Sequence, residues 1–188
     1  QHALRLPAGL ESGAYRWELA LCSRTGGTCS EGVAIGALRV SALDRRFDVP
    51  PLDVRADVRL GGVVTLLGAT LVPSDTLLAP GGTLSVTLVW RAEAEMAVSQ
   101  RVFLHLLGAD GGVLAQSDGE PAGWTRPTTG WLPGEVVLDE RVLTIPSDAA
   151  SGEYVLQAGM YTLDGGRLKA ADGRDAVRLV VLTVGAGP

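Results

Sequence analysis

The 188-residue sequence contains no asparagine and only one lysine against fifteen arginines. Without asparagine there is no N-x-S/T acceptor for N-glycosylation, and turns must be formed mainly by glycine, proline and aspartate. The 25 Gly and 10 Pro residues are spaced in the way that separates short elements. A codon bias toward G and C, or a thermophilic source, would each explain this composition.

The chain also lacks a strong excess of one charge and a long apolar run. Its formal net charge is -5, and the 16 basic residues are scattered singly among 21 acidic ones. With no basic stripe to neutralise phosphates, nucleic acid is not expected as a partner. The longest nearly apolar stretch, 61–72, is too short to cross a bilayer core of about 30 Å as a helix, so we expect no membrane span. Because Gln1 follows no basic and apolar leader, any export signal or membrane anchor is expected outside this sequence.

Residues able to support catalysis are scarce. Two histidines and two cysteines cannot supply a zinc site at the usual spacing, and no serine lies in a G-x-S-x-G elbow. Asp139 and Glu140 are neighbours on an expected strand, so they point to opposite faces and cannot act on one bond. His105 shares a strand face with Phe103 and Leu107, and a hydrogen-bonded core or edge histidine is favoured over a general base. We therefore predict no catalytic residue, metal or cofactor in this fragment.

The dominant pattern that is present is alternation of apolar and polar residues with a period of two. Leu84, Val86, Leu88 and Trp90 form one side of such a strand, with Ser85 and Thr87 on the other side. Further strands are expected near residues 15–21, 33–40, 54–60, 63–72, 101–107, 112–116, 136–145, 154–160 and 175–184. Short strands separated by Gly and Pro turns predict an all-β fold, an antiparallel β-sandwich of the immunoglobulin-like or carbohydrate-binding-module-like kind.

An internal repeat predicts the domain organisation. A shift of 139 positions places these residues on identical ones: Leu4, Pro7, Ser12, Gly13, Tyr15, Gly26 and Gly27 on Leu143, Pro146, Ser151, Gly152, Tyr154, Gly165 and Gly166. Residues 1–43 are therefore interpreted as the C-terminal half, the last three strands, of a preceding β-sandwich repeat, and 55–184 as a complete domain. Residues 44–54, which contain two adjacent prolines, are interpreted as a linker, and 185–188 as a tail.

The half repeat should not stand alone, because a small isolated sheet is marginal in water and leaves one apolar face open. We expect Tyr15, Trp17, Leu19 and Leu21 to be covered by the complete domain, by another chain or by missing upstream strands. Exposure of these side chains would argue against this boundary or strand register.

Cys22 and Cys29 flank a predicted Thr-Gly-Gly turn. A hairpin at this turn could bring their Cα atoms within the roughly 4.4 to 6.8 Å that a disulfide requires. We predict a disulfide, with two reduced cysteines as the alternative, and a disulfide favours an oxidising compartment.

The segment 116–135 has an unusual composition, because two tryptophans stand among polar groups in a long Gly- and Pro-rich loop. If the domain binds a ligand, this loop is the predicted site, since binding groups concentrate on loops held by a rigid scaffold. The candidate contacts are Trp124 and Trp131 as stacking platforms, Arg126 as a donor fork, and Asp118 with Thr128 as partners for hydroxyls. The favoured alternative is that both tryptophans fold back and cap the end of the sandwich.

Several motifs of the chain resemble those of a known group of modules. They lie at Pro80–Ala92, Phe103–Leu107, Asp110–Gly111, Gln116–Asp118, Pro127–Glu135 and Gly152–Tyr161. These stretches look like the β-sandwich modules at the C-termini of bacterial multi-span membrane glycosyltransferases, similar to the protein mannosyltransferase and aminoarabinose transferase class. That resemblance implies an extracytoplasmic, membrane-tethered position and a parent enzyme whose catalytic loops are absent here.

The functional expectation is thus a non-catalytic accessory module of a membrane-bound glycosyltransferase. It would serve as a spacer, a docking surface or a glycan-recognition domain, with a glycan or the membrane-embedded part of its own parent as partner. The alternative is a free-standing carbohydrate-binding or adhesion module of a secreted protein.

Overall fold

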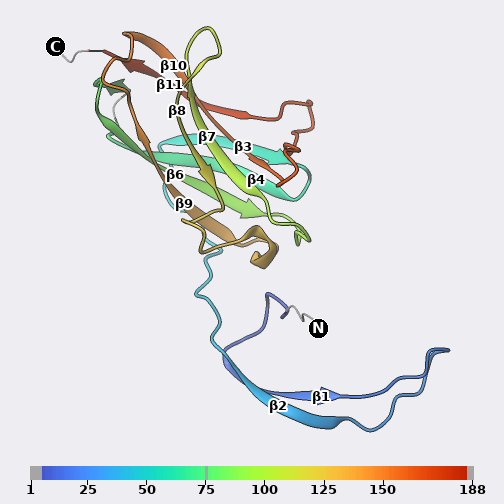
Figure 1. Ribbon diagram of the computed structural model, residues 1–188. Coiled ribbons are helices and arrows are strands. Elements are labelled where there is room, and N and C mark those ends of the chain that lie inside the picture. Colours follow the sequence, from blue (N-terminus) through green and yellow to red (C-terminus); the bar gives the residue numbers. More distant parts are fainter. Residues whose placement is uncertain (1–5, 75, 186–188) are drawn as a thin grey trace. The chain divides into compact units, whose positions relative to one another are not determined.

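The computed structural model describes residues 6–74 and 76–185 and divides the chain into two units, Gln1–Asp44 and Arg45–Pro188 (Figure 1). Leu4 of the repeat and residues 186–188 of the predicted tail lie outside the described residues. Within those ranges no helix is long and apolar enough to cross a membrane.

Strands make up the regular structure of both units. They are β1 (Gly13–Leu19), β2 (Val33–Val40), β3 (Val54–Leu60), β4 (Val64–Val72), β5 (Leu77–Leu78), β6 (Thr83–Ala92), β7 (Arg101–Leu107), β8 (Val113–Gly119), β9 (Val136–Thr144), β10 (Gly152–Tyr161) and β11 (Val177–Val184). One 3-10 turn, η1 (Thr128–Gly130), lies in the loop between β8 and β9. The chain is therefore all-β, as the alternation predicted.

The second unit contains two facing sheets (Figure 1). One has the strand order β3-β4-β6-β9 and the other has the order β5-β11-β10-β7-β8. Neighbouring strands are antiparallel except β5 and β11, which are parallel. The predicted antiparallel β-sandwich is confirmed.

The core lies between the sheets and is filled by alternate residues of each strand. Trp90 of β6, Leu104 of β7 and Leu156 of β10 have no exposed surface and belong to one buried cluster. Leu84, Val86 and Leu88 line the same cluster, so the face predicted from their spacing is the buried one. Burial of such side chains, at about 1.5 to 3 kcal/mol each, is the main stabilising contribution.

The second unit begins earlier than the sequence predicted. The Arg46 carbonyl accepts a hydrogen bond from the Val136 amide at 2.8 Å, and Leu52 packs against the buried cluster of Leu67, Val89 and Val136. Residues 45–54 are therefore part of the sandwich and not a free linker, because they pair with the start of β9 and cover one side of its sheet.

The first unit is an antiparallel hairpin of β1 and β2. Of the three strands expected for residues 1–43, two lie in the described part. Leu19 and Leu21 are 59% and 77% exposed, whereas Tyr15 and Trp17 are half-buried. The expected covering of this face is therefore not observed for Leu19 and Leu21.

Candidate functional site

Two of the predicted ligand contacts in the loop 116–135 are buried. Trp131 is 1% exposed, and its indole nitrogen donates to the Arg126 carbonyl at 3.0 Å. Thr128 is fully buried, and its hydroxyl oxygen accepts a hydrogen bond from the backbone N–H of Gln100 at 2.9 Å. The prediction that these two side chains contact a ligand is wrong, because neither reaches solvent and both fill hydrogen-bonding needs of the fold.

Arg126 is also committed to the fold. Its guanidinium pairs with Glu135, a carboxylate without exposed surface that Arg45 contacts from a second direction. The Leu132 amide donates to the same carboxylate at 2.9 Å. A buried carboxylate needs such partners, and removing one leaves an uncompensated charge. Arg126 is therefore not the free donor fork that the sequence predicted.

Trp124 has the opposite environment. It is 60% exposed, and the Arg101 guanidinium carbon lies 5.0 Å from the centroid of its ring. Ala122, Gly123 and Trp124 all have positive φ, between 50° and 71°, a conformation that is uncommon for residues other than glycine. Trp131 is therefore buried as the capping interpretation expected, whereas Trp124 lies against Gly119 at the end of β8 but stays largely exposed.

Asp118 lies on a strand and not in the loop, because β8 continues to Gly119. It pairs with Phe103 across β7 and β8, and its Oδ1 lies 3.2 Å from the Nε2 of His105. The sequence predicted a hydrogen-bonded histidine at position 105, and the structure shows one. The structure supplies a carboxylate that orients the imidazole, and the contact joins a largely buried His105 ring to an Asp118 side chain that is 33% exposed.

Around this pair, the outward residues of three strands meet on the outer face of the five-stranded sheet. Val102, Leu104 and Leu106 point into the core, so Phe103 and His105 point outward. The strand registers place two cross-strand rows on this face, Gln157-His105-Gln116 and Gly159-Phe103-Asp118.

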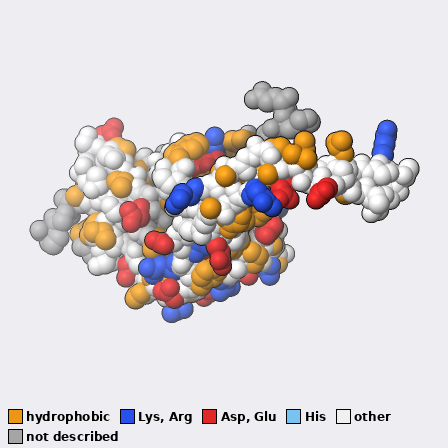
Figure 2. Space-filling model, turned by 90° about the horizontal axis from the view of Figure 1, so that it is seen from below, with side chains coloured by type: hydrophobic (Ala, Val, Ile, Leu, Met, Phe, Trp, Pro, Cys, Tyr) orange, Lys and Arg blue, Asp and Glu red, His pale blue; other side chains and the backbone are white. Residues whose placement is uncertain are grey.

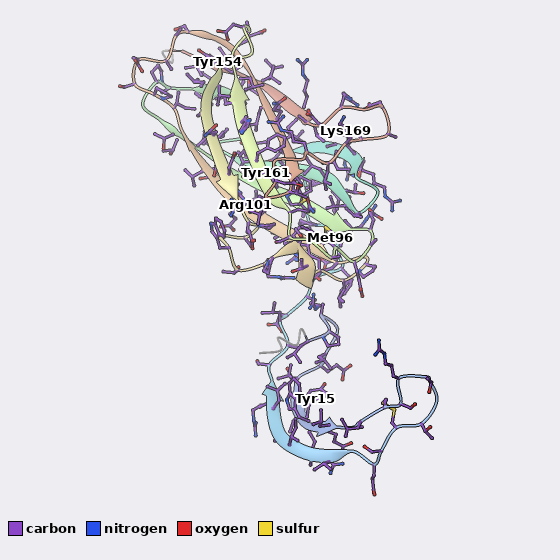
Figure 3. All side chains as sticks on the ribbon, turned by 45° about the vertical axis from the view of Figure 1, so that its right-hand side comes forward. Tyr15, Met96, Arg101, Tyr154, Tyr161 and Lys169 are labelled. Carbon is purple, nitrogen blue, oxygen red and sulfur yellow. A yellow bond between two sulfur atoms is a disulfide. The ribbon has the colours of Figure 1, made fainter. Side chains whose placement is uncertain are left out.

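Phe103 is covered by side chains from this same face. The Arg167 guanidinium carbon lies 4.3 Å from its ring centroid, and the Tyr161 ring centroid is 6.4 Å away. A Cβ at Gly159 would come within 2.5 Å of the Phe103 ring, so glycine lets the ring lie across β10. Figure 3 shows Tyr161 next to Arg101, its cross-strand partner.

These residues surround a hollow of about 190 Å³, which we call the outer-face site. It is lined by Phe103, His105, Asp118, Tyr161, Gly165 and Arg167. The half-buried Tyr161 ring offers an apolar face, while the imidazole, carboxylate and guanidinium offer donors and acceptors. No Ser, Thr or Cys is among these described lining residues, so a histidine-activated nucleophile of that kind is not present at this position.

A metal centre is not formed in the described ranges, 6–74 and 76–185. They contain no group of three or more His, Cys, Asp or Glu side chains placed to hold an ion.

A larger hollow, of about 620 Å³, lies where the loops after β7 and β9 approach each other. Its polar side chains include Asp110, Asp148 and Glu153, and its one aromatic residue is Tyr154. The Tyr154 hydroxyl already donates to the Ala150 carbonyl at 2.9 Å. Despite its size, this hollow lacks the cationic and imidazole donors and the partly exposed aromatic ring of the outer-face site, which is the better candidate.

Sequence reasoning missed Tyr161 and Arg167 and assigned no binding role to His105. One signal was available, because Phe103-x-His105 and Gln116-x-Asp118 each place two such residues on one strand face. That signal does not reveal which strands are neighbours, and Arg167 comes from a connection whose path depends on the tertiary fold.

A solved structure, the C-terminal domain of wzt, is similar to this chain with a TM-score of 0.53 and 16% sequence identity. The match covers 71% of this chain and 84% of that chain. No family model matches the sequence, and no curated protein matches it. At this identity the likeness supports the β-sandwich fold and assigns no family.

Proposed function

We propose that this chain is a non-catalytic module that recognises carbohydrate through the outer-face site. The observation that carries the proposal is the hollow in which Tyr161, His105, Asp118 and Arg167 meet on a rigid sheet. A sugar has apolar C–H faces that pack on aromatic rings and hydroxyls that both donate and accept hydrogen bonds. The site offers both kinds of partner.

Each side chain has a distinct role in this proposal. The half-buried Tyr161 ring provides the packing surface, since Phe103 beneath it is almost fully covered. Asp118 accepts hydrogen bonds from hydroxyls while it also orients His105, and Arg167 donates. The hollow is smaller than the roughly 300 to 1,000 Å³ of drug-sized sites. We therefore expect it to hold a single sugar residue with weak affinity.

We further propose that the module lies outside the cytoplasm and accompanies a membrane-bound glycosyltransferase. The resemblance of its motifs supports this parent, and the bond between Cys22 and Cys29 suits an oxidising compartment. The alternative parent is a secreted protein in which the module is free-standing. The gene upstream of residue 1 separates the two: several apolar spans support the first, and a signal peptide followed by repeats supports the second.

The binding proposal is tested by screening the 188-residue chain on a glycan array and titrating any ligand found. Tyr161→Ala and Asp118→Ala should each weaken binding about tenfold, which corresponds to about 1.4 kcal/mol. Asp148→Asn, in the larger hollow, is the matched control and should bind normally. Circular dichroism checks that every variant is folded.

Loss of binding in Asp148→Asn together with normal binding in Tyr161→Ala would move the site to the larger hollow. Trp124→Ala tests the loop predicted from sequence, and full loss of binding in this variant alone would return the site to that loop. A folded chain that binds no glycan would leave a spacer or docking role as the better account.

A further inference from the structure

The hairpin of the first unit has the same backbone pairing as β10 and β11. Its Cα pairs run from Gly13–Val40 to Leu19–Val33, and those of the second run from Gly152–Val184 to Ala158–Val177. Adding 139 to each residue number in β1 and 144 to each residue number in β2 converts every β1–β2 pair into a β10–β11 pair. The bulge between Trp17 and Glu18 falls, with the same shift of 139, on the bulge between Leu156 and Gln157.

Side-chain and turn hydrogen bonds repeat as well. The Tyr15 hydroxyl donates to the Glu11 carbonyl at 3.0 Å, and the Tyr154 hydroxyl donates to the Ala150 carbonyl at 2.9 Å. Figure 3 labels both tyrosines. A tyrosine that bonds to the backbone a few residues upstream marks one corner of immunoglobulin-like sandwiches. In the turns, Gly26 donates to the Ser23 carbonyl as Gly165 does to Thr162.

The two hairpins differ in what covers their apolar face. In the sandwich this face is buried in the core, and its residues are Tyr154, Leu156, Ala158, Leu182 and Val184. The corresponding residues, which we call the hairpin face, are Tyr15, Trp17, Leu19, Leu38 and Val40. They are half-buried or exposed, and Figure 2 shows hydrophobic side chains at the surface along this hairpin.

We infer that Gln1–Asp44 is the closing hairpin of a second β-sandwich, and that the hairpin face is an interaction surface for the other strands of that sandwich. Those strands belong to the same polypeptide and precede residue 1. They provide a strand that pairs with β1, as β7 pairs with β10, and a facing sheet that covers the hairpin face.

A second copy of this chain does not fit this surface in the same way. In the complete domain the equivalent position is already filled, because β10 is paired with both β7 and β11, and β11 is paired with both β10 and β5. The partner must therefore be a sandwich that lacks its own last hairpin. An isolated two-stranded hairpin is at best marginally stable in water, which gives the surface a reason to be covered.

The inference is tested by hydrogen exchange, measured on the 188-residue chain and on the natural polypeptide extended upstream by one sandwich, roughly 100 residues. The β1 amides should exchange at least 100-fold more slowly in the extended protein, whereas the β10 amides should be unchanged. Equal exchange of β1 in both proteins would overturn the inference. So would a gene that encodes no sandwich ahead of residue 1, or a dimer of the 188-residue chain with protected β1 amides.

A variant pair tests the face itself. In the extended protein, Trp17→Ser should lower the melting temperature of the added sandwich by several degrees. Arg16→Ser, on the opposite face of the same strand, should leave it within about one degree. Equal shifts for the two variants would show that the hairpin face is not buried and would overturn the inference.

Discussion

Trp124 and Trp131 lie in the same loop, surrounded by similar polar residues, yet one is 60% exposed and the other 1%. The indole of Trp131 enters the core because its N–H finds the Arg126 carbonyl. Trp124 follows two residues with positive φ and lies outside the core beside Arg101. The difference shows that a loop with the composition of a binding site can be used almost entirely to close a sandwich. The groups of the proposed outer-face site lie on the five-stranded sheet and on the connection after β10.

The largest difference is expected between two single variants, in which Trp131 or Trp124 is truncated to alanine. Trp131→Ala should lower the free energy of unfolding by about 3 to 5 kcal/mol, because it empties a buried volume. Trp124→Ala should change it by no more than about 0.5 kcal/mol. Urea unfolding followed by circular dichroism measures both values. Similar losses in the two variants would contradict the contrast between these residues.

Replacement of Arg141 tests the buried polar groups that contact the loop between β8 and β9. Arg141 pairs with Asp139 at 3.0 Å and donates to the carbonyls of Gly119 and Glu120, while Asp139 accepts the Ala122 amide. Arg141→Met should cost about 3 to 5 kcal/mol at neutral pH, because Asp139 is left buried without its counter-charge. Urea unfolding at pH 7 measures this loss, and Asp139→Asn combined with Arg141→Met should recover part of it.

The same variant has a predicted pH dependence. Burial raises the pKa of Asp139, and Arg141 together with the Ala122 amide opposes the rise. Because the pKa of Asp139 is raised in the folded state, protonation of Asp139 stabilises the folded protein. This stabilisation is fully present below the pKa of an unfolded aspartate, about 3.9, and is lost as pH rises through the pKa of the folded protein. The deficit of Arg141→Met should therefore shrink on acidification. A deficit that stays constant between pH 7 and pH 4 would show that the ion pair is not its cause.

A smaller effect is expected at Thr128. Thr128→Val keeps the shape of the side chain but removes the hydroxyl that accepts the hydrogen bond of the Gln100 backbone N–H. The free energy of unfolding should fall by about 1 to 3 kcal/mol. Thr128→Ser retains the hydroxyl and should recover most of the stability lost in the valine variant. If valine and serine are equally destabilising, the methyl group and not the hydrogen bond is what matters at this position.

The smallest effect on the sandwich is expected from the cysteines. Cys22 and Cys29 are bonded in the first unit, so reduction should leave the unfolding midpoint of the second unit unchanged. In protein recovered from its native compartment, both thiols should resist alkylation until a reductant is added, as mass measurement would show. Two freely alkylated thiols would remove this support for a location outside the cytoplasm.

Much of the fold could be predicted from the sequence because its signals are local. Alternation over Leu84–Trp90 and Tyr154–Met160 predicts one apolar side on each strand, and in each of the two strands this apolar side is buried. Glycine at the turn before β8, where Gly111 has a φ of 80°, supplies a conformation that few other residues adopt. The repeated Tyr and Gly-Gly positions also fall at matching places in two hairpins that have the same backbone pairing.

The site depended on contacts between distant segments. His105 and Asp118 meet only because β7 and β8 pair in one particular register, and a shift of one residue would turn the carboxylate to the other face. Arg167 reaches Phe103 from the connection between β10 and β11. The alternation of residues along each strand can be read from the amino-acid order alone. The outward residues that share a face depend on strand order and register, because these are set by the packing of the whole sandwich.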